Sequence, residues 1–261
     1  MTDLNAQWLL LHGALELARA GLPVFPLIPK GKEPRFKGSF HDASTDQTEI
    51  TAHWRRHRND NIGCRPPQNV FVLDVDPRHN GDVELACLAA EYGPLPQTWT
   101  ARTGSGGWHY WYNTSATNGI RGKLRPGIDI KHHHNGYVVA PPSTHPCGER
   151  YWWQRSPRGP HPTAAPPWLE TGIQRPIADR WLHTVGGMNG HGEYTLQCLV
   201  TRISAAREGD RNRTLYGACR DALRQGDLDA FEPDLIAAAV GIGLDMPEIE
   251  STVRSVRGSR P

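Results

Sequence analysis

The sequence of 261 residues has no long apolar run, nothing that resembles a signal peptide, and few cysteines. A membrane-spanning helix needs about 20 consecutive apolar residues, whereas the apolar stretch WLLLHGALELA is interrupted by His12 and Glu16. The five cysteines are odd in number and form no C-x-x-C pair, which argues against a disulfide framework and a zinc knuckle. We therefore expect a cytoplasmic protein without a membrane partner.

Charge of one sign is also not in large excess. Lys and Arg number 29 and Asp and Glu number 27, which gives a formal net charge of +2. The basic surplus lies in residues 1–175, and the remainder is slightly acidic. Global charge would not hold a polyanion, so any nucleic acid must bind in a local groove.

The pattern of apolar residues divides the chain into two parts. The first part alternates helical and strand-like segments and predicts an α/β domain with a mostly antiparallel sheet. Helices are expected near 4–20, 46–57 and 80–92, and strands near 23–28, 70–76, 97–102, 107–113 and 136–140. A proline-dense stretch at 156–176 predicts a linker or an irregular wrap. Four segments with helical spacing follow, so we expect one domain at 1–175 and a small all-helical domain at 176–261.

The segment VFVLDVD, residues 70–76, ends an apolar strand with two aspartates. Side chains alternate along a strand, so Asp74 and Asp76 share a face with Val70 and Val72. Their Cα atoms should lie roughly 6.5–7 Å apart, close enough for each carboxylate to raise the pKa of the other unless a cation lies between them. This geometry suggests a divalent metal site. The alternative is a turn, because Asp commonly begins turns and DPRHNGD is rich in turn formers.

A glycine-rich motif, TGSGGWHYWYN, occupies residues 103–113. Its small residues would let backbone N–H groups approach a phosphate closely, because glycine has no Cβ. In the strand that follows, His109 points away from the face that carries Trp108 and Tyr110. The alternatives are a simple hairpin turn and a structural histidine.

A third polar motif, PGIDIKHHHNG, occupies residues 126–136. Ile128 and Ile130 face one way, so Asp129 and Lys131 face the other. Asp129 is then either a third functional carboxylate or the ion-pair partner of Lys131. The three histidines directly precede the turn signal NG, so we interpret them as solvent-exposed turn residues and not as metal ligands.

Together these motifs supply what two-metal phosphoryl transfer requires. Carboxylates hold two cations about 3.5–4 Å apart, and a cationic or donor group holds a triphosphate. In their order along the chain, the segments GLPVFPL, KGKEP, DASTD, NIG, VLDVD, TGSGGWHYWY, PGIDIK and YVVAPPS resemble the bifunctional primase–polymerase (prim-pol) family of the archaeo-eukaryotic primase superfamily, found in phages, plasmids and related mobile elements. The resemblance covers about residues 8–155.

The resemblance implies a fold and a function. The fold is an α/β protein with an RRM-like archaeo-eukaryotic primase catalytic core and an N-terminal α/β unit. The function is template-directed nucleotidyl transfer on single-stranded DNA, as a DNA primase and DNA polymerase. Asp74, Asp76 and Asp129 would be the catalytic residues and the ligands of Mg²⁺ or Mn²⁺ in a two-metal site. The implied nucleotide-binding residues are Ser105, Gly106, Gly107, His109, Lys131, Lys30 and Lys32.

The segment EGDRNRTLYGACRDALRQG, residues 208–226, resembles the opening of a helix in small domains that follow primase cores. Arg211 and Arg213 would hold template phosphates or the triphosphate of the initiating nucleotide at the helix N-terminus. The alternative is an ordinary helix cap by Asp210 or Asn212. Expected partners are a single-stranded DNA template, nucleoside triphosphates and a replicative helicase. Because the sequence has no Walker motif, the helicase would lie in a further C-terminal part or in a separate protein.

Two other functions remain open from the sequence alone. An HUH-type single-strand nicking initiator would use His132 and His134 as metal ligands and Tyr137 as nucleophile, although its motif has a bulky apolar residue where His133 stands. A non-catalytic module would bind single-stranded DNA on stacking platforms such as Trp108, Tyr110 and Trp152. Three carboxylates on matched faces argue against that module, because they repel a DNA backbone.

Overall fold

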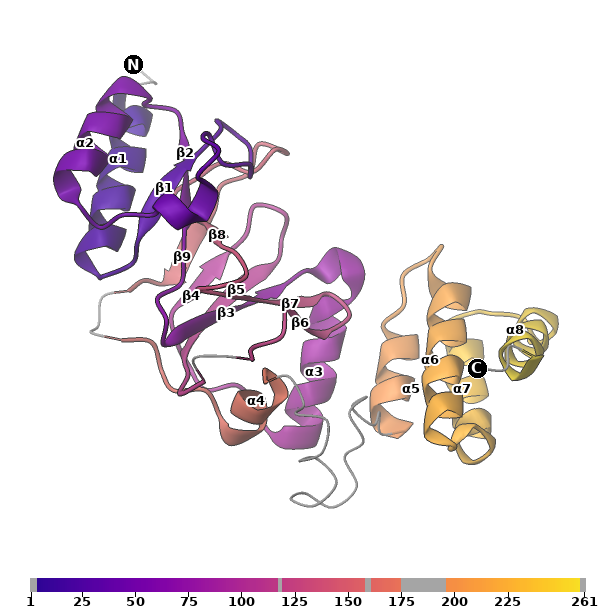
Figure 1. Cartoon of the computed structure of the whole chain (residues 1–261). Coiled ribbons are helices and arrows are strands. Elements are labelled where there is room, and N and C mark those ends of the chain that lie inside the picture. Colours follow the sequence, from indigo (N-terminus) through magenta and orange to yellow (C-terminus); the bar gives the residue numbers. More distant parts are fainter. Residues whose placement is uncertain (1–3, 117–118, 158–160, 175–195, 259–261) are drawn as a thin grey trace. The chain divides into compact units, whose positions relative to one another are not determined.

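The computed structural model describes residues 4–116, 119–157, 161–174 and 196–258 (Figure 1). The chain divides into two compact units. The first combines Met1–Asp82 with Leu95–Arg175, and the second combines Val83–Pro94 with Pro176–Pro261. Among the described residues, no helix has the length and apolar character needed to cross a membrane.

The first unit contains two antiparallel sheets. The smaller sheet has the order β1-β2-β8, with β1 Val24–Leu27, β2 Asn61–Cys64 and β8 Val138–Ala140. The larger sheet has the order β6-β7-β3-β5-β4-β9, with β6 Lys123–Arg125, β7 Ile128–His132, β3 Val70–Val75, β5 Trp108–Asn113, β4 Thr100–Arg102 and β9 Trp152–Arg155. The helical elements of this unit are α1 Leu4–Arg19, η1 Ser39–Asp42, α2 Gln47–Arg56, η2 Pro77–His79 and α4 Pro167–Gly172.

The main core of this unit lies between the helices α1 and α2 and the two sheets (Figure 1). Asp46 starts α2 by accepting hydrogen bonds from the backbone N–H groups of Thr48 and Glu49. Side chains from helices and strands then meet in a single buried cluster that includes Leu17, Trp54, Ile62, Val72 and Trp111. Burying each such side chain contributes about 1.5–3 kcal/mol, so this cluster fixes one face of the larger sheet against α1 and α2.

Strand β3 is central in the larger sheet and is buried on both faces. Val70 and Val72 point into the core with α1 and α2, and Phe71, Leu73 and Val75 are buried on the opposite face. Burial on both faces explains why the strand reads as a nearly continuous apolar run. The apolar run ends at Asp74, because the face that carries Val70 and Val72 is no longer covered by the core at this position.

The second unit is built from helices. They are the part of α3 (Gly81–Tyr92) from Val83 onward, α5 Leu196–Ser204, α6 Arg211–Gln225, α7 Leu228–Gly241 and α8 Met246–Gly258. Their apolar faces form one cluster that includes Leu199, Leu215, Leu235 and Ile249. Arg202 of α5 is buried and forms ion pairs with Glu84 of α3 at 3.1 Å and with Asp221 of α6 at 2.8 Å. Loss of one partner of such a buried pair typically costs about 3–5 kcal/mol, so this triad holds α3 among the C-terminal helices.

Most predicted elements are present, and the differences are informative. The apolar pattern does not reveal the short strands β2, β6 and β9, and it does not place α3 with the C-terminal helices. Part of the proline-dense stretch, at 161–174, packs on the first unit as an irregular wrap: Asn113 donates a hydrogen bond to the Pro162 carbonyl, and Glu170 accepts one from Thr114. The stretch also contains α4. Residues 158–160 and 175–195 lie outside the described residues.

Gly127 provides a test of the backbone contact that holds the end of β3. Its carbonyl accepts a hydrogen bond from Asp76 N–H at 2.8 Å, its φ is +69°, and a Cβ would lie 2.5 Å from Gly81 N. We expect Gly127→Ala to lower the melting temperature by several degrees more than Gly148→Ala. Gly148 has a φ of +97° but no atom within 4 Å of a Cβ. Both variants carry the penalty for a left-handed backbone. The difference between their free energies of unfolding, roughly 1–3 kcal/mol, therefore reports the steric clash alone.

Thermal unfolding of the two variants followed by circular dichroism measures this difference. Equal losses of stability would show that the close approach of Gly127 and Gly81 is unimportant.

Candidate active site

The antiparallel register of β7, β3 and β5 aligns three polar side chains. Asp74 of β3 pairs directly with Asp129 of β7 on one side and with His109 of β5 on the other. Residues directly opposite each other in antiparallel strands project from the same face of the sheet. Asp129, Asp74 and His109 therefore form a row across the three central strands.

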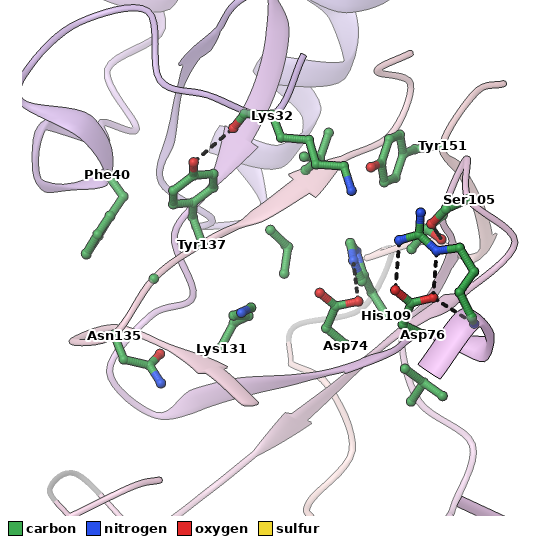
Figure 2. Close-up of a pocket in the computed structure, with 16 residues that line it drawn as sticks. Lys32, Phe40, Asp74, Asp76, Ser105, His109, Lys131, Asn135, Tyr137 and Tyr151 are labelled. Carbon is green, nitrogen blue, oxygen red and sulfur yellow. Dashed lines mark hydrogen bonds and ion pairs between the residues drawn. The ribbon is translucent and has the colours of Figure 1, made fainter. Parts of the chain in front are cut away.

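This row borders a pocket of ≈ 390 Å³ between the two sheets. Asp74 and His109 form part of its floor, and β8 contributes Val138 and Val139 to its wall. Figure 2 shows the side chain of Lys32 reaching toward the same space from the opposite side. The sheet face that is apolar at Val72 thus becomes polar where it opens into the pocket.

Asp74 is held as an anion by basic neighbours. His109 Nε2 lies 3.4 Å from Asp74 Oδ1, and the side chains are 5% and 33% exposed, respectively. Burial raises the pKa of Asp74, but the charge and hydrogen bond of His109, with the charges of Lys131 and Lys32, outweigh burial and leave the pKa below its usual value. The Nδ1 atom of His109 is buried and has no hydrogen-bond partner among the described residues.

Asp76 follows the last residue of β3 and also caps η2. Arg78 donates from Nε to Oδ1 at 3.0 Å and from Nη2 to Oδ2 at 2.8 Å, and the Arg78 N–H bonds Oδ1 at 3.0 Å (Figure 2). These side-chain hydrogen bonds, the largest influence, hold the pKa of Asp76 well below its usual range. Asp76 thus begins a turn, as the alternative interpretation has it, and it also lines the pocket together with Asp74.

Asp129 has two lysine partners. Lys131 Nζ lies 3.2 Å from Oδ2, and Lys123 Nζ lies 3.7 Å from Oδ1. Lys131 also lines the pocket, whereas Asp129 is not among the residues that line it. Ile128 and Ile130 are fully buried on the opposite face of β7, as the alternation predicts. The ion pair foreseen as an alternative to a functional carboxylate is present.

The glycines of the glycine-rich loop are explained by the geometry of the turn and its packing on β3, and not by phosphate binding to the backbone. Gly107 N–H donates to Thr103 Oγ1 at 2.8 Å and Gly106 N–H donates to the Thr103 carbonyl at 3.0 Å, so both groups are used within the turn. A Cβ on Gly107 would lie 2.4 Å from the Val75 carbonyl oxygen, so glycine is needed for close packing on β3. Thr103 and Ser105 are the residues of this loop that line the pocket.

The two predicted lysines differ in position. Lys32 lines the pocket, and its backbone carbonyl accepts a hydrogen bond from the Tyr137 hydroxyl at 2.9 Å (Figure 2). Lys30 is exposed, has a φ of +54°, and is not among the residues that line the pocket. The structure therefore brings Lys32, but not Lys30, to the carboxylates.

Sequence reasoning missed two residues of this pocket. The sequence predicts only a turn at Arg78, although its position two residues after Asp76 allows both its Nε and Nη2 atoms to contact the Asp76 carboxylate. Tyr151 is buried in the pocket wall, and burial raises the pKa of its phenol. Tyr151 lies far from the aspartates in sequence, and no local pattern around it indicated a role.

The residues of the nicking alternative do not form one site. His132 pairs with Phe71 and so projects from the face of the sheet opposite to Asp74. Tyr137 lines the pocket on the Asp74 side. His134 is exposed and its backbone N–H donates to His132 Nδ1 at 3.3 Å. This arrangement does not support a histidine-bound metal beside a tyrosine nucleophile.

Arg211 and Arg213 belong to the second unit, at the start of α6. Arg213 is 83% exposed and forms an ion pair with Asp210 at 2.9 Å. Arg211 is half-buried, and its Nη1 atom lies 3.5 Å from the Cβ position of Gly243. Asp210 occupies the N-cap position without a side-chain capping hydrogen bond. The helix start therefore keeps donor groups available, and Arg213 extends into solvent beside it.

The carboxylates can be assessed as ligands for a divalent cation. Among the described residues, no three His, Cys, Asp or Glu side chains are close enough to form a complete metal site. However, Mg²⁺ is commonly bound by one or two carboxylates together with substrate phosphates, and oxygen ligands suit Mg²⁺ and Mn²⁺. Asp74 and Asp76 line the pocket, and Asp129 pairs with Asp74 on the neighbouring strand. Their carboxylate oxygens suit a cation that is shared with a phosphate-bearing substrate.

Comparison with known proteins gives two findings. A solved structure, "Crystal structure of primase RepB'", matches with 12% sequence identity over 96% of this chain and 99% of that chain, at a TM-score of 0.32. A comparison with curated proteins gives no significant match. Residues 14–168, more than half of the chain, match the family model described as the N-terminal domain of bifunctional DNA primase/polymerase. The chain therefore belongs to the Prim-Pol family.

Proposed function

We propose that this protein is a template-directed nucleotidyltransferase that acts as a DNA primase and DNA polymerase on single-stranded DNA. The observation that carries the proposal is the row of Asp129, Asp74 and His109 beside a pocket in a Prim-Pol chain. The family match supports a nucleotidyltransferase role at the coarser level.

In this proposal Asp74, Asp76 and Asp129 hold two divalent cations, Mg²⁺ or Mn²⁺. Such cations lower the pKa of an attacking hydroxyl and neutralise charge on the transferred phosphate. The protein's part is to position them: the β-sheet register fixes Asp74 opposite Asp129, and Gly127 fixes the backbone of Asp76. Arg78 and Lys131 neutralise two of these carboxylates and must release them for a cation to bind.

The triphosphate of the incoming nucleotide binds to the basic and donor groups around the pocket. Lys32 and Lys131 supply positive charge, and the Ser105 hydroxyl and His109 supply hydrogen bonds. The unpaired, buried Nδ1 atom of His109 supports this role, because a buried polar atom without a partner is costly unless a ligand satisfies it. These groups stabilise the charge that develops on the leaving pyrophosphate.

The finer assignments of fold and context are part of the same proposal. The larger sheet is the RRM-like catalytic core, and the helical unit, which combines Val83–Pro94 with Pro176–Pro261, binds the template or the initiating nucleotide. The partners are a single-stranded template, nucleoside triphosphates and a replicative helicase in a mobile element. A cytoplasmic setting completes the proposal.

A single assay tests the proposed function. The purified chain is incubated with single-stranded template, labelled nucleoside triphosphates and Mn²⁺ or Mg²⁺, with and without an annealed primer. Template-dependent products that require the divalent ion are expected. Absence of products under both conditions would refute the proposal.

The carboxylates generate the first prediction from this function. We expect Asp74→Asn, Asp76→Asn and Asp129→Asn each to reduce incorporation at least about 100-fold. Loss of a cation ligand removes several kcal/mol of transition-state stabilisation, and each 1.36 kcal/mol is a factor of ten. Asp82→Asn is the matched control, because Asp82 is exposed and does not line the pocket. Near-normal activity in any of the three, with unchanged thermal unfolding, would remove that residue from the catalytic site.

His109 generates the second prediction. We expect His109→Ala to weaken nucleotide binding about tenfold, because the triphosphate loses one hydrogen bond from the imidazole ring. Binding of Mn²⁺ without nucleotide should not weaken, because the substitution removes a competing partner of Asp74. Isothermal titration calorimetry measures both affinities. A loss of Mn²⁺ affinity would instead assign His109 to the metal site.

The start of α6 generates the third prediction. Initiation must hold two free nucleotides on the template, whereas extension holds one beside a duplex end, so initiation needs a second cationic site. We expect the double variant Arg211→Ala/Arg213→Ala to reduce de novo primer synthesis at least about tenfold more than extension of a supplied primer. Arg220→Ala/Arg254→Ala is the control, since both arginines are exposed on the same helical unit.

Both activities are measured on the same template at one salt concentration, because phosphate contacts weaken as salt rises. Equal loss of initiation and extension, or no loss of either, would show that these arginines do not bind the initiating nucleotide.

A further inference from the structure

A row of aromatic and basic side chains crosses the larger sheet on the face opposite to the pocket. Arg102 of β4 pairs directly with Trp108 of β5 and with Trp152 of β9. The neighbouring residues His109 and Trp153 face the other way, toward the pocket and the core with α1 and α2. Together with Tyr110, which shares the face of Trp108, these residues form what we call the outer platform: Arg102, Trp108, Tyr110 and Trp152.

The side chains of the outer platform are arranged for stacking. The Arg102 guanidinium carbon lies 4.4 Å from the centroid of the Trp108 ring. The rings of Trp108 and Tyr110 are stacked, with centroids 6.1 Å apart and an angle of 29° between their planes. Trp152 is 51% exposed, and Arg102, Trp108 and Tyr110 are half-buried. The outer platform therefore combines one exposed tryptophan with a cation–π pair and a further aromatic ring.

Arg102 gives the outer platform a positive charge, and Glu16 of α1 lines a hollow that Trp152 also borders. In the part of the chain that the structure describes, no carboxylate forms an ion pair with Arg102. Arg155, which pairs with Thr100 next to the row, is also exposed. Aromatic rings that stack on bases, together with guanidinium groups that contact phosphates or stack on bases, are the means by which sheet surfaces bind single-stranded nucleic acid.

The outer platform is continuous with the pocket through the glycine-rich loop. Arg102 directly precedes Thr103, and Thr103 and Ser105 line the pocket. On the outer side of the same turn, Arg102 Nη2 lies 3.8 Å from the Cβ position of Gly106. A DNA strand that leaves the pocket across this turn therefore meets Arg102 next.

We propose that the outer platform binds single-stranded DNA that passes from the pocket over the loop at residues 103–107. A second copy of the chain is a poorer occupant, because packing a like surface against it would bury two unpaired guanidinium groups. DNA supplies both of the groups that the surface matches, flat bases and negative phosphates. The path of the strand from the pocket rests on the proposed function, whereas binding of DNA to the outer platform can be measured without nucleotidyl transfer.

The test uses the full chain and a fluorescently labelled oligothymidylate of about 12 nucleotides, a length within the usual range for such surfaces. Fluorescence anisotropy gives the Kd in EDTA without nucleotides, so that catalysis cannot contribute. We expect Trp152→Ala and Arg102→Ala each to raise the Kd at least about fivefold, the low end for loss of one stacked base. Trp152→Phe should retain most of the affinity, because a phenyl ring still stacks.

Matched controls are available in the same unit. Trp8→Ala removes another tryptophan that is 45% exposed, and Arg56→Ala removes an exposed arginine of α2. Both controls should change the Kd less than twofold.

The outcomes separate this inference from the proposed function. Platform-dependent DNA binding by a chain that incorporates no nucleotide would support the inference and refute the function. Nucleotide incorporation by a chain whose Trp152→Ala and Arg102→Ala variants bind DNA normally would overturn the inference alone. A change in the oligomeric state of these variants by light scattering, with unchanged Kd, would assign the face to a second copy of the chain and also overturn it.

Discussion

The candidate site depends on the pairing register of β7, β3 and β5. One register places Asp129, Asp74 and His109 side by side, and a shift by one residue would turn the carboxylates toward the face that holds Leu73 and Ile130. The apolar residues between the polar ones prevent this shift, since both faces of β3 are buried. The packing that stabilises the sheet is therefore also what positions the chemistry.

Electrostatics in the pocket follow from that arrangement. Like charges on neighbouring strands would repel one another, yet each aspartate has a basic partner: His109 for Asp74, Arg78 for Asp76 and Lys131 for Asp129. These pairs lower the pKa of Asp74 and Asp76. Both carboxylates are therefore ionised without a metal. In the proposed function, the same partners turn from the carboxylates to the phosphate groups of the nucleotide.

The sequence predicted the local part of this site and not the long-range part. Strand alternation is local, so it correctly placed Asp129 and Lys131 opposite Ile128 and Ile130. The opposition of Asp74 and Asp129 depends on register, which one sequence does not specify. The glycine-rich loop shows a further limit: glycine is required there, but the contact between Gly107 and the Val75 carbonyl explains it better than an anion does.

The pairing of β3 with β7 also constrains how the protein folds. Asp74 and Asp129 are separated in sequence by the whole of α3, β4 and β5, so their contact closes a long loop and is expected to form slowly. During synthesis, the chain exposes an acidic strand end before its partner strand exists. Lys131 and Lys123 are made with Asp129, while Arg78 is made with Asp76. Each charged segment thus emerges from the ribosome with its own counter-charge, before the sheet brings the segments together.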